Sequence, residues 1–309
     1  MTGLNRYIAE EIATDHVDGL LTRREALRRL GLLGVSGTAA ATLIAACARA
    51  ETSKPTAETS KPTAETSRAP ASTTGTQPPG MAGALATSPV TWPGPQGQLQ
   101  GAWARAAEPK GAVLVIHENK GLTDWVRSVA GRLAGAGYSA LAIDLLSEKG
   151  GTGALGDPAQ ATAALAGIAP EQFVQDLNSG VGQLRKLAPT QKIGVVGFCF
   201  GGGLVWQLLG AGAPSVSAAV PFYGPLPDNA NFGEAKAAVL GIYAALDNRV
   251  TGSQPAAEAA LARAGLVHEL IVEPDADHAF FNDTGPRYNA VAAADAWQRT
   301  LDWFGRYLA

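Results

Sequence analysis

The chain has little cysteine, little net charge and no long apolar run, and each shortage excludes a class of protein. Its 309 residues include two cysteines, 24 basic side chains and 27 acidic ones. The near-neutral charge argues against nucleic-acid binding, which needs a basic surface. The cysteines do not make a disulfide framework, because one ends an N-terminal apolar run and the other lies deep in an α/β pattern. The apolar run, residues 30–46, is too short and too weak for a permanent membrane span.

Signatures of cofactors and metals are missing as well. The segments "HE" (117–118) and "DADH" (275–278) lack the spacing of zinc ligands, and the cysteine of "GFCFGGG" (197–203) has no cysteine neighbour. Those glycines follow a strand, but no acidic residue is placed downstream to bind a ribose, as a dinucleotide site requires. We therefore expect the protein to work without a cofactor or a metal ion, and not to bind nucleic acid.

Residues 1–47 have the features of an export signal. Arg23 and Arg24 form a twin-arginine pair ahead of the apolar run, although Ala26 stands where that motif usually has a bulky apolar residue. The segment 4–20, which has helical spacing and several acids, would then be a discarded extension before the signal. We expect the protein to be exported across a bacterial cytoplasmic membrane by the twin-arginine route.

The signal ends in "IAAC", whose small residues before Cys47 resemble a bacterial lipoprotein cleavage site. Cleavage there would make Cys47 the lipidated N-terminus of a membrane-tethered protein, and this lipid is the only membrane contact that we expect. The alternative is ordinary signal-peptidase cleavage at "ACA" (46–48), which yields a periplasmic or secreted protein. The mass of the mature N-terminus distinguishes the two.

A linker, residues 48–87, follows the signal. It contains the seven-residue unit ETSKPTA twice and the start of a third copy at residues 51–67, and then continues rich in Ser, Thr, Pro and Gly. No position of the unit carries a large apolar residue and each proline breaks a helix, so the repeat is not a coiled coil. Such a segment cannot bury enough apolar surface to offset its ordering entropy, which predicts a disordered tether.

The remaining residues, 88–309, form the predicted globular domain. Residues 99–107 alternate like a strand that is exposed on one face. Further strands are expected at residues 111–118, 139–146, 192–198, 216–224, 237–247 and 267–274, and the first of these is a continuous apolar run. Helical spacing of apolar residues occurs between and after them, at residues 124–138, 170–187, 201–210, 253–265 and 288–308. Buried strands that alternate with helices indicate an α/β fold with a mostly parallel central sheet and helices on both faces.

Four reactive side chains are expected at the C-terminal ends of these strands, where active groups gather in parallel sheets. They are Glu118 in "VIHE", Cys199 in "VVGFC", Asp247 in "GIYAALD" and His278 in "VEPDADH". A thiol, a histidine and an acid are the parts of nucleophilic acyl transfer: a nucleophile, a base that takes its proton and an acid that orients the base. The alternative roles are a buried structural cysteine, a polar loop histidine and a solvated turn acid.

The segment "GFCFG", residues 197–201, has the G-x-nucleophile-x-G form of a strand-to-helix elbow. Its glycines allow close backbone packing while Cys199 adopts a strained, exposed conformation. The helix that begins at Phe200 points its free N–H groups and the positive end of its dipole at the site, which favours a thiolate and an oxyanion. The order nucleophile, acid, histidine along the chain is that of α/β-hydrolases.

From about Val90 to Leu308 the chain resembles the dienelactone hydrolase (carboxymethylenebutenolidase) family of the α/β-hydrolase fold. The resemblance rests on "HENKGL" (117–122), "DLL" (144–146), "GFCFGG" (197–202), "LDNRV" (246–250) and "DADHAF" (275–280). It implies a carboxylic ester hydrolase that cleaves a lactone or ester through a thioester intermediate. It also implies site residues: Cys199 as nucleophile, His278 as base, Asp247 as orienting acid, Glu118 as an additional glutamate, and the backbone N–H groups of Phe200 and Asn119 as the oxyanion hole.

The role that the resemblance implies for Glu118 agrees with its chemistry. A free thiol is only a few per cent ionised at pH 7, and a nearby carboxylate opposes its ionisation. The resemblance suggests that this glutamate holds the resting thiol until an anionic substrate displaces it. Capping of the following helix is the alternative role for Glu118.

One position departs from the family pattern. Well-known members carry an arginine four residues after the histidine, where it binds the substrate carboxylate, and this chain has Asn282 there. Arg249 and Arg287 are candidate replacements. A neutral or differently shaped lactone or ester is therefore as good a candidate substrate as dienelactone. The departure also keeps a second function open, in which an exported lipoprotein uses the fold as a non-catalytic binding module.

Residues that line the substrate are less clearly marked in the sequence. Trp125, Tyr223, Phe280 and Arg249 are candidates for contacting a small-molecule lactone or ester, although aromatic residues at such spacing usually belong to the core. The glycine-rich loop at 150–157 is a candidate lid. We expect the protein to act as a monomer.

Overall fold

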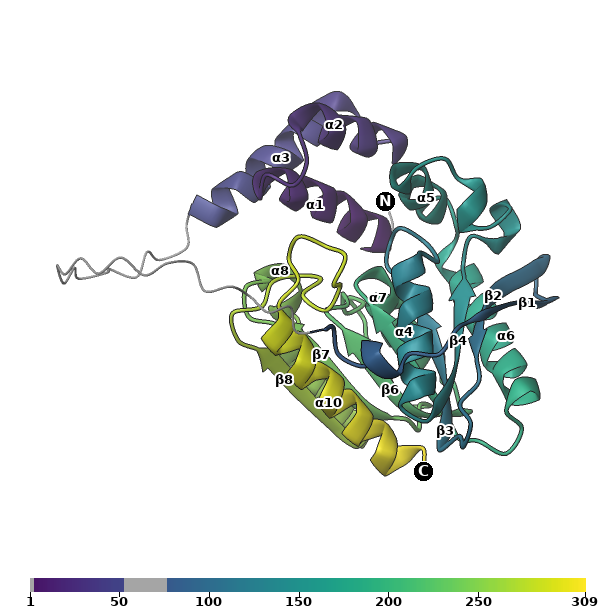
Figure 1. Ribbon diagram of the computed structural model, residues 1–309. Coiled ribbons are helices and arrows are strands. Elements are labelled where there is room, and N and C mark those ends of the chain that lie inside the picture. Colours follow the sequence, from purple (N-terminus) through teal and green to yellow (C-terminus); the bar gives the residue numbers. More distant parts are fainter. Residues whose placement is uncertain (1–2, 53–76) are drawn as a thin grey trace, which may run out of the picture. The chain divides into compact units, whose positions relative to one another are not determined.

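The computed structural model describes residues 3–52 and 77–309, which form two compact units (Figure 1). One unit contains residues 78–309 together with the chain up to residue 8, and the other contains residues 9–77. Residues 53–76, which hold nearly all of the ETSKPTA repeats, lie outside the described residues, so the disordered tether stays a prediction.

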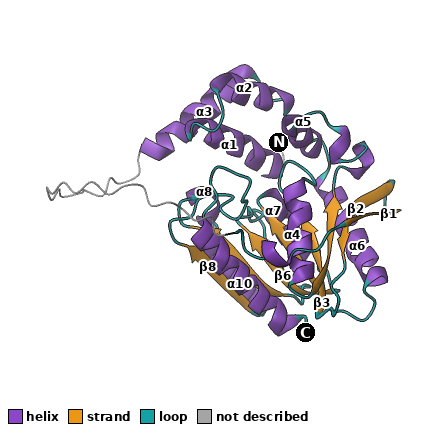
Figure 2. Cartoon of the chain, in the orientation of Figure 1, coloured by secondary structure: helices purple, strands orange, loops and turns teal. Residues whose placement is uncertain are grey.

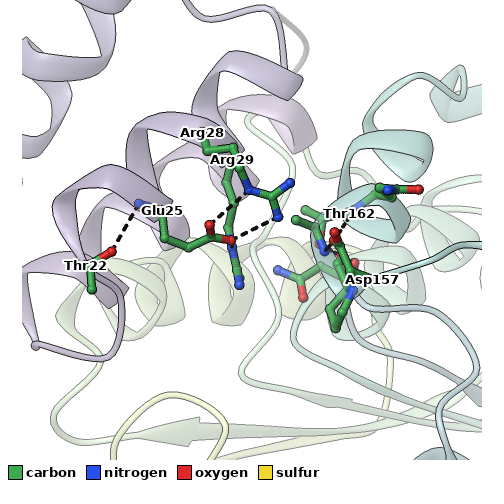
Figure 3. Close-up of polar contacts among 10 residues, drawn as sticks. Thr22, Glu25, Arg28, Arg29, Asp157 and Thr162 are labelled. Atoms are coloured by element: carbon green, nitrogen blue, oxygen red, sulfur yellow. Dashed lines mark hydrogen bonds and ion pairs between the residues drawn. The ribbon is translucent and has the colours of Figure 1, made fainter.

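Three helices precede the linker: α1 (Gly3–Val17), α2 (Arg23–Leu32) and α3 (Gly37–Thr52). The twin-arginine pair starts α2, and Thr22 caps that helix by accepting a hydrogen bond from the Glu25 amide at 3.2 Å (Figure 3). The Glu25 carboxylate accepts hydrogen bonds from Arg28 at 2.9 Å and Arg29 at 2.7 Å, and these bonds lower the pKa of Glu25 to about 2. Among the described residues, no helix combines the length and the apolar character needed to cross a bilayer.

Eight strands form one sheet in the order β1-β2-β4-β3-β5-β6-β7-β8 (Figure 2). The strands are β1 (Ser88–Pro93), β2 (Gln98–Ala104), β3 (Gly111–Ile116), β4 (Tyr138–Asp144), β5 (Ile193–Phe198), β6 (Val216–Phe222), β7 (Ala238–Ala244) and β8 (His268–Glu273). The pairs β1–β2 and β2–β4 are antiparallel, and the other neighbouring pairs are parallel. The predicted α/β-hydrolase architecture with a mostly parallel sheet is confirmed.

Helices cover both faces of this sheet. The α-helices of this domain are α4 (Asp124–Gly135), α5 (Pro158–Ala166), α6 (Pro170–Leu187), α7 (Phe200–Gly210), α8 (Asn248–Thr251), α9 (Gln254–Arg263) and α10 (Ala290–Tyr307). In Figure 2, α4 and α10 lie in front of the sheet, whereas α6 and α7 pack against β3 and β5 from behind. Every residue of β3, β4, β5 and β7 is buried, as expected of strands covered on both faces.

β1 and α5 are among the elements of this domain that are not evident in the sequence. β1 is a largely exposed edge strand that contains Pro89 and Pro93, so it lacks the apolar run of a buried strand. α5 is short and rich in alanine, so its sequence shows no distinct apolar stripe. Its start is nevertheless well defined, because Asp157 accepts the amide hydrogen of Ala159 at 2.7 Å and Pro158 occupies the first turn (Figure 3).

Candidate active site

The turn from β5 into α7 holds Cys199 at φ 57° and ψ −118°, a conformation that residues other than glycine rarely adopt. The neighbouring glycines allow this turn. A Cβ atom on Gly197 would lie 2.2 Å from the carbonyl oxygen of Gly201, and one on Gly201 would lie 2.5 Å from the carbonyl oxygen of Ile116. Because these approaches are closer than a side chain permits, the turn that places Cys199 at the C-terminal edge of the sheet requires glycine at both positions.

His278 follows β8 on a short loop and bonds to Asp247, which follows β7. His278 Nδ1 donates to Asp247 Oδ2 at 2.6 Å, and both side chains are buried. Asp247 also caps α8 by accepting the amide hydrogen of Val250 at 3.3 Å. Burial alone raises the pKa of Asp247, but the charge and hydrogen bond of His278, together with Arg249, outweigh burial and hold that pKa below its ordinary value. The pair is an imidazole oriented by an ionised carboxylate.

The thiol and the imidazole meet at this edge of the sheet. Cys199 Sγ lies within 4.8 Å of a ring nitrogen of His278. Only 2% of Cys199 and 5% of His278 is exposed, so bulk solvent is largely excluded from both. The Tyr223 ring packs edge-on against the imidazole, with ring centres 5.1 Å apart. Cys199, Tyr223 and Ala279 all have positive φ, so strained backbone gathers around the pair.

A second buried polar pair connects the loop after β3 to the loop after His278. Asn282 Nδ2 donates to Glu118 Oε2 at 2.8 Å. Asn282 Oδ1 accepts hydrogen bonds from the amide and the hydroxyl of Thr284, at 3.0 Å and 2.7 Å. Because Thr284 donates to the amide oxygen, the nitrogen is the group that faces Glu118. The hydrogen bond from Asn282 to Glu118 therefore comes from an uncharged donor.

The loop that carries Glu118 and Asn119 is held by bonds from two neighbouring elements. The buried His117 donates from Nδ1 to the Glu118 carbonyl oxygen at 2.6 Å and accepts the Leu145 amide hydrogen at Nε2, at 3.1 Å. Burial lowers the pKa of His117, which favours the neutral ring that this pair of bonds needs. The hydroxyl of Thr162, in α5, donates to the Asn119 carbonyl oxygen at 2.9 Å.

The glycine-rich loop at 150–157 is bonded to the same region. The Thr152 hydroxyl donates to Asp144 Oδ1 at 2.8 Å and accepts the amide hydrogen of Leu122 at 2.8 Å. The Thr152 amide donates to Asp144 Oδ2 at 2.7 Å. These bonds connect the candidate lid to the segment that carries Glu118, and its movement stays a prediction.

The two predicted oxyanion donors lie at the ends of the neighbouring strands β3 and β5. Phe200 is the first residue of α7, so its amide has no acceptor within the helix. Asn119 follows Glu118 in the loop after β3. Both amides are thus carried by the strand pair that also carries Cys199.

The aromatic residues predicted to line the substrate belong to a buried cluster. Trp125 packs edge-on against Phe198, with ring centres 5.1 Å apart, and is 4% exposed. Phe280 is fully buried against Phe222 and Tyr223. These rings pack at the strand ends. Of the three predicted aromatic residues, Tyr223 packs against the His278 ring.

Tyr7, near the start of α1, also lies at this site, although nothing in the sequence predicts it there. Its hydroxyl is 3.1 Å from His278 Nε2 and 3.4 Å from Cys199 Sγ. Arg249 covers the tyrosine, with Cζ 4.3 Å from the ring centre. This part of α1 belongs to the same compact unit as the sheet. The sequence predicts only a discarded extension of the signal at residues 4–20, and no residue spacing indicates a partner 192 or 271 positions away.

Comparison with known proteins now identifies the family. Residues 99–308 match the Dienelactone hydrolase family. A protein of Methylorubrum extorquens named carboxymethylenebutenolidase is 32% identical over 242 residues, which cover 73% of this chain and 83% of that protein. One of Escherichia coli O157:H7 with the same name is 34% identical over 212 residues, which cover 64% of this chain and 78% of that protein. The chain belongs to the dienelactone hydrolase family. It is a hydrolase of the ester type.

A solved structure agrees with this dienelactone hydrolase fold. The crystal structure of a protein named dienelactone hydrolase from Klebsiella pneumoniae is 29% identical to this chain, with a TM-score of 0.62, and the match covers 72% of this chain and 100% of that one. The family match includes the predicted strand-end residues, Glu118, Cys199, Asp247 and His278. It ends before the N-terminal signal, so export and lipidation at Cys47 stay predictions.

Proposed function

We propose that this dienelactone hydrolase family member cleaves a neutral ester or lactone through a thioester on Cys199, with His278 as base and Asp247 as the acid that orients it. The observation that carries the proposal is a buried His278–Asp247 pair within 4.8 Å of a thiol in a strained elbow. Strained backbone of this kind clusters at active sites, where the surrounding structure holds it in place.

The proposed reaction balances with the groups present. His278 Nε2 takes the thiol proton while Sγ bonds to the carbonyl carbon, and the carbonyl electron pair moves to oxygen. When the tetrahedral intermediate collapses, the bond to the leaving oxygen breaks and the imidazolium returns the proton to that oxygen. Water then attacks the thioester with His278 again as base, which releases the acid and restores the thiol. Asp247 keeps the Nδ1 proton in place and stabilises the imidazolium in both halves.

The oxyanion formed in each half needs donors that are already in place. We assign this role to the backbone amides of Phe200 and Asn119. The Phe200 amide opens α7, so the positive end of the helix dipole adds to its effect. The Asn119 loop is bonded by Thr162 and His117, so its amide need not reorganise during the reaction.

The Glu118–Asn282 pair supports a neutral substrate. An uncharged amide attracts a substrate carboxylate much less than the guanidinium of an arginine would. A carboxylate bound beside Glu118 would meet repulsion with no compensating cation from position 282. Arg287 is engaged with Asp277, at 3.6 Å, which argues against Arg287 as a replacement.

The proposal is tested by hydrolysis of p-nitrophenyl acetate with the full chain and two cysteine variants. The wild type and Cys47→Ala are expected to release nitrophenol and to carry a transient acetyl group on Cys199 that neutral hydroxylamine removes. Cys199→Ala is expected to do neither, because the nucleophile is missing. The same comparison is made in chains that carry Tyr7→Ala, because the Tyr7 hydroxyl contacts both Cys199 and His278. Equal rates with and without Cys199→Ala in both backgrounds, or an acetyl group on another side chain, would show that the proposal is wrong.

The substrate charge is tested by replacing Asn282 with arginine. The measured quantity is the ratio of kcat/KM for p-nitrophenyl acetate to that for the anionic mono-p-nitrophenyl succinate. We expect Asn282→Arg to shift the ratio toward the anion about tenfold, because a charged donor then bonds the substrate carboxylate. Asn231→Arg adds the same charge at an exposed loop and is the control. An unchanged ratio in Asn282→Arg would exclude position 282 as the determinant of substrate charge.

A further inference from the structure

We infer that residues 4–8 are an internal inhibitor that blocks the catalytic pair, an inference that rests on the proposed roles of Cys199 and His278. The segment is the start of α1 and belongs to the compact unit that contains the sheet. Tyr7 is 5% exposed, and its hydroxyl lies within hydrogen-bonding distance of both the nucleophile and the base. One side chain therefore contacts both groups that must act on a substrate.

The Tyr7 hydroxyl contacts the two atoms that the proposed reaction uses, Cys199 Sγ and His278 Nε2. His278 Nδ1 keeps its proton toward Asp247, so Nε2 presents its lone pair and accepts the tyrosine hydroxyl hydrogen at 3.1 Å. A substrate carbonyl carbon must approach Sγ to about 3–3.5 Å, and the Tyr7 oxygen already lies 3.4 Å from Sγ. Because a phenol oxygen is not an electrophile, this occupant cannot be turned over.

Three of the five side chains of the segment are buried and apolar or aromatic. Leu4, Tyr7 and Ile8 recur at the i, i+3, i+4 spacing of one helix face, and all three are buried. Arg249 adds a contact on the far side of the tyrosine: its guanidinium lies 4.3 Å from the ring centre, and its Nη1 donates to the Tyr7 carbonyl oxygen at 3.3 Å.

Polar contacts fix the segment beyond Tyr7. Asn5 Nδ2 donates to the carbonyl oxygen of Ala166, at the end of α5, at 2.9 Å. Arg6 forms an ion pair with Asp228 at 3.4 Å, but both side chains are mostly exposed, so this pair contributes little. The Asn5 bond is therefore the stronger polar contact of the segment. Arg6 is a suitable control position within the segment, because replacing it should leave the segment in place.

The position of residues 4–8, ahead of the predicted cleavage site, would make the block temporary. Residues 4–8 lie upstream of Cys47, so the cleavage predicted there removes them. Residues 4–8 would then cover Cys199 and His278 before cleavage, and a substrate could reach both side chains after it. While covered, the thiol is also shielded from oxidation, to which an accessible thiolate is prone.

The test uses the full chain with Tyr7→Ala, Tyr7→Phe, Ile8→Asp and the control Arg6→Ala. Two quantities are measured: the rate of iodoacetamide labelling at Cys199, located by peptide mapping, and kcat/KM for p-nitrophenyl acetate. We expect both to rise about tenfold or more in Tyr7→Ala and Ile8→Asp, to rise less in Tyr7→Phe, and to stay unchanged in Arg6→Ala. Thermal unfolding of each variant checks that the fold is intact.

The outcomes separate this inference from the proposed function. Labelling that rises without ester turnover in any variant would support the block and overturn the proposed hydrolysis. Unchanged labelling and turnover in Tyr7→Ala and Ile8→Asp, with turnover still dependent on Cys199, would overturn the block alone. A loss of turnover in both Tyr7→Phe and Tyr7→Ala would also overturn it, because the hydroxyl would then assist the reaction.

Discussion

Replacing His278 by glutamine is expected to lower kcat/KM for p-nitrophenyl acetate about 10⁴-fold or more. In the proposed mechanism the imidazole takes the thiol proton and returns it to the leaving group, so both steps would lose their proton carrier. Glutamine still offers an N–H to the buried Asp247, which at present accepts the His278 hydrogen bond at 2.6 Å. The fold should therefore persist, and the loss should fall on the chemical step.

The matched control is His268→Gln. His268 starts β8, and its ring nitrogens lie 2.7 Å from the Leu266 carbonyl oxygen and 3.0 Å from Glu258 Oε1. We expect its activity to stay close to that of the wild type. The measurement is made in the wild-type and the Tyr7→Ala chains, so that the inferred block does not hide the effect. A loss of less than tenfold in His278→Gln would contradict the assignment of His278 as base.

Replacing Gly201 by alanine is expected to destabilise the domain by about 3 kcal/mol and to abolish ester hydrolysis. A Cβ atom there would lie 2.5 Å from the Ile116 carbonyl oxygen and 2.6 Å from that of His117. Both are backbone atoms at the end of β3, so no side-chain rotation relieves the contact. The elbow would have to move away from β3, which would shift Cys199 and the Phe200 amide together.

The control for this substitution is Gly182→Ala, in the interior of α6. A Cβ atom at Gly182 meets no atom within 4 Å, so alanine should stabilise the helix by about 0.5 kcal/mol. Thermal unfolding checks both variants, since 1 kcal/mol corresponds to about 2–4 °C in Tm for a domain of this size. Equal Tm values for the two variants would show that the close approach at Gly201 carries no cost.

The central strands and the order of the strand-end residues were predictable because they depend on local patterns. A run such as residues 111–118 is apolar throughout, which is sufficient to indicate a strand buried on both faces. Parallel strands then bring their C-terminal ends to one edge, so Cys199, Asp247 and His278 could be expected together before any contact was known. The sequence does not predict β1 and α5, because neither carries a distinct apolar pattern.

Contacts between distant loops could not be predicted in this way. Asn282 is recognisable in the sequence as a departure from the family pattern, but its bond to Glu118 joins residues 164 positions apart. The sequence also contains no sign that His117 would bond to Leu145, or that Thr162 would bond to Asn119. Such pairs depend on loop conformations that no residue spacing specifies.

The sequence alone determined the fold class, the strained elbow and the residue types of the reactive groups, because periodicity, glycine spacing and chain order act locally. Tertiary structure alone decided which groups those residues face. Glu118 faces a neutral amide, and Cys199 and His278 face Tyr7, which lies 192 positions from the cysteine and 271 from the histidine. These contacts form only when distant segments pack together at the edge of the sheet. There each buried polar atom needs a hydrogen-bond partner, and the side chains must fill the space between the segments.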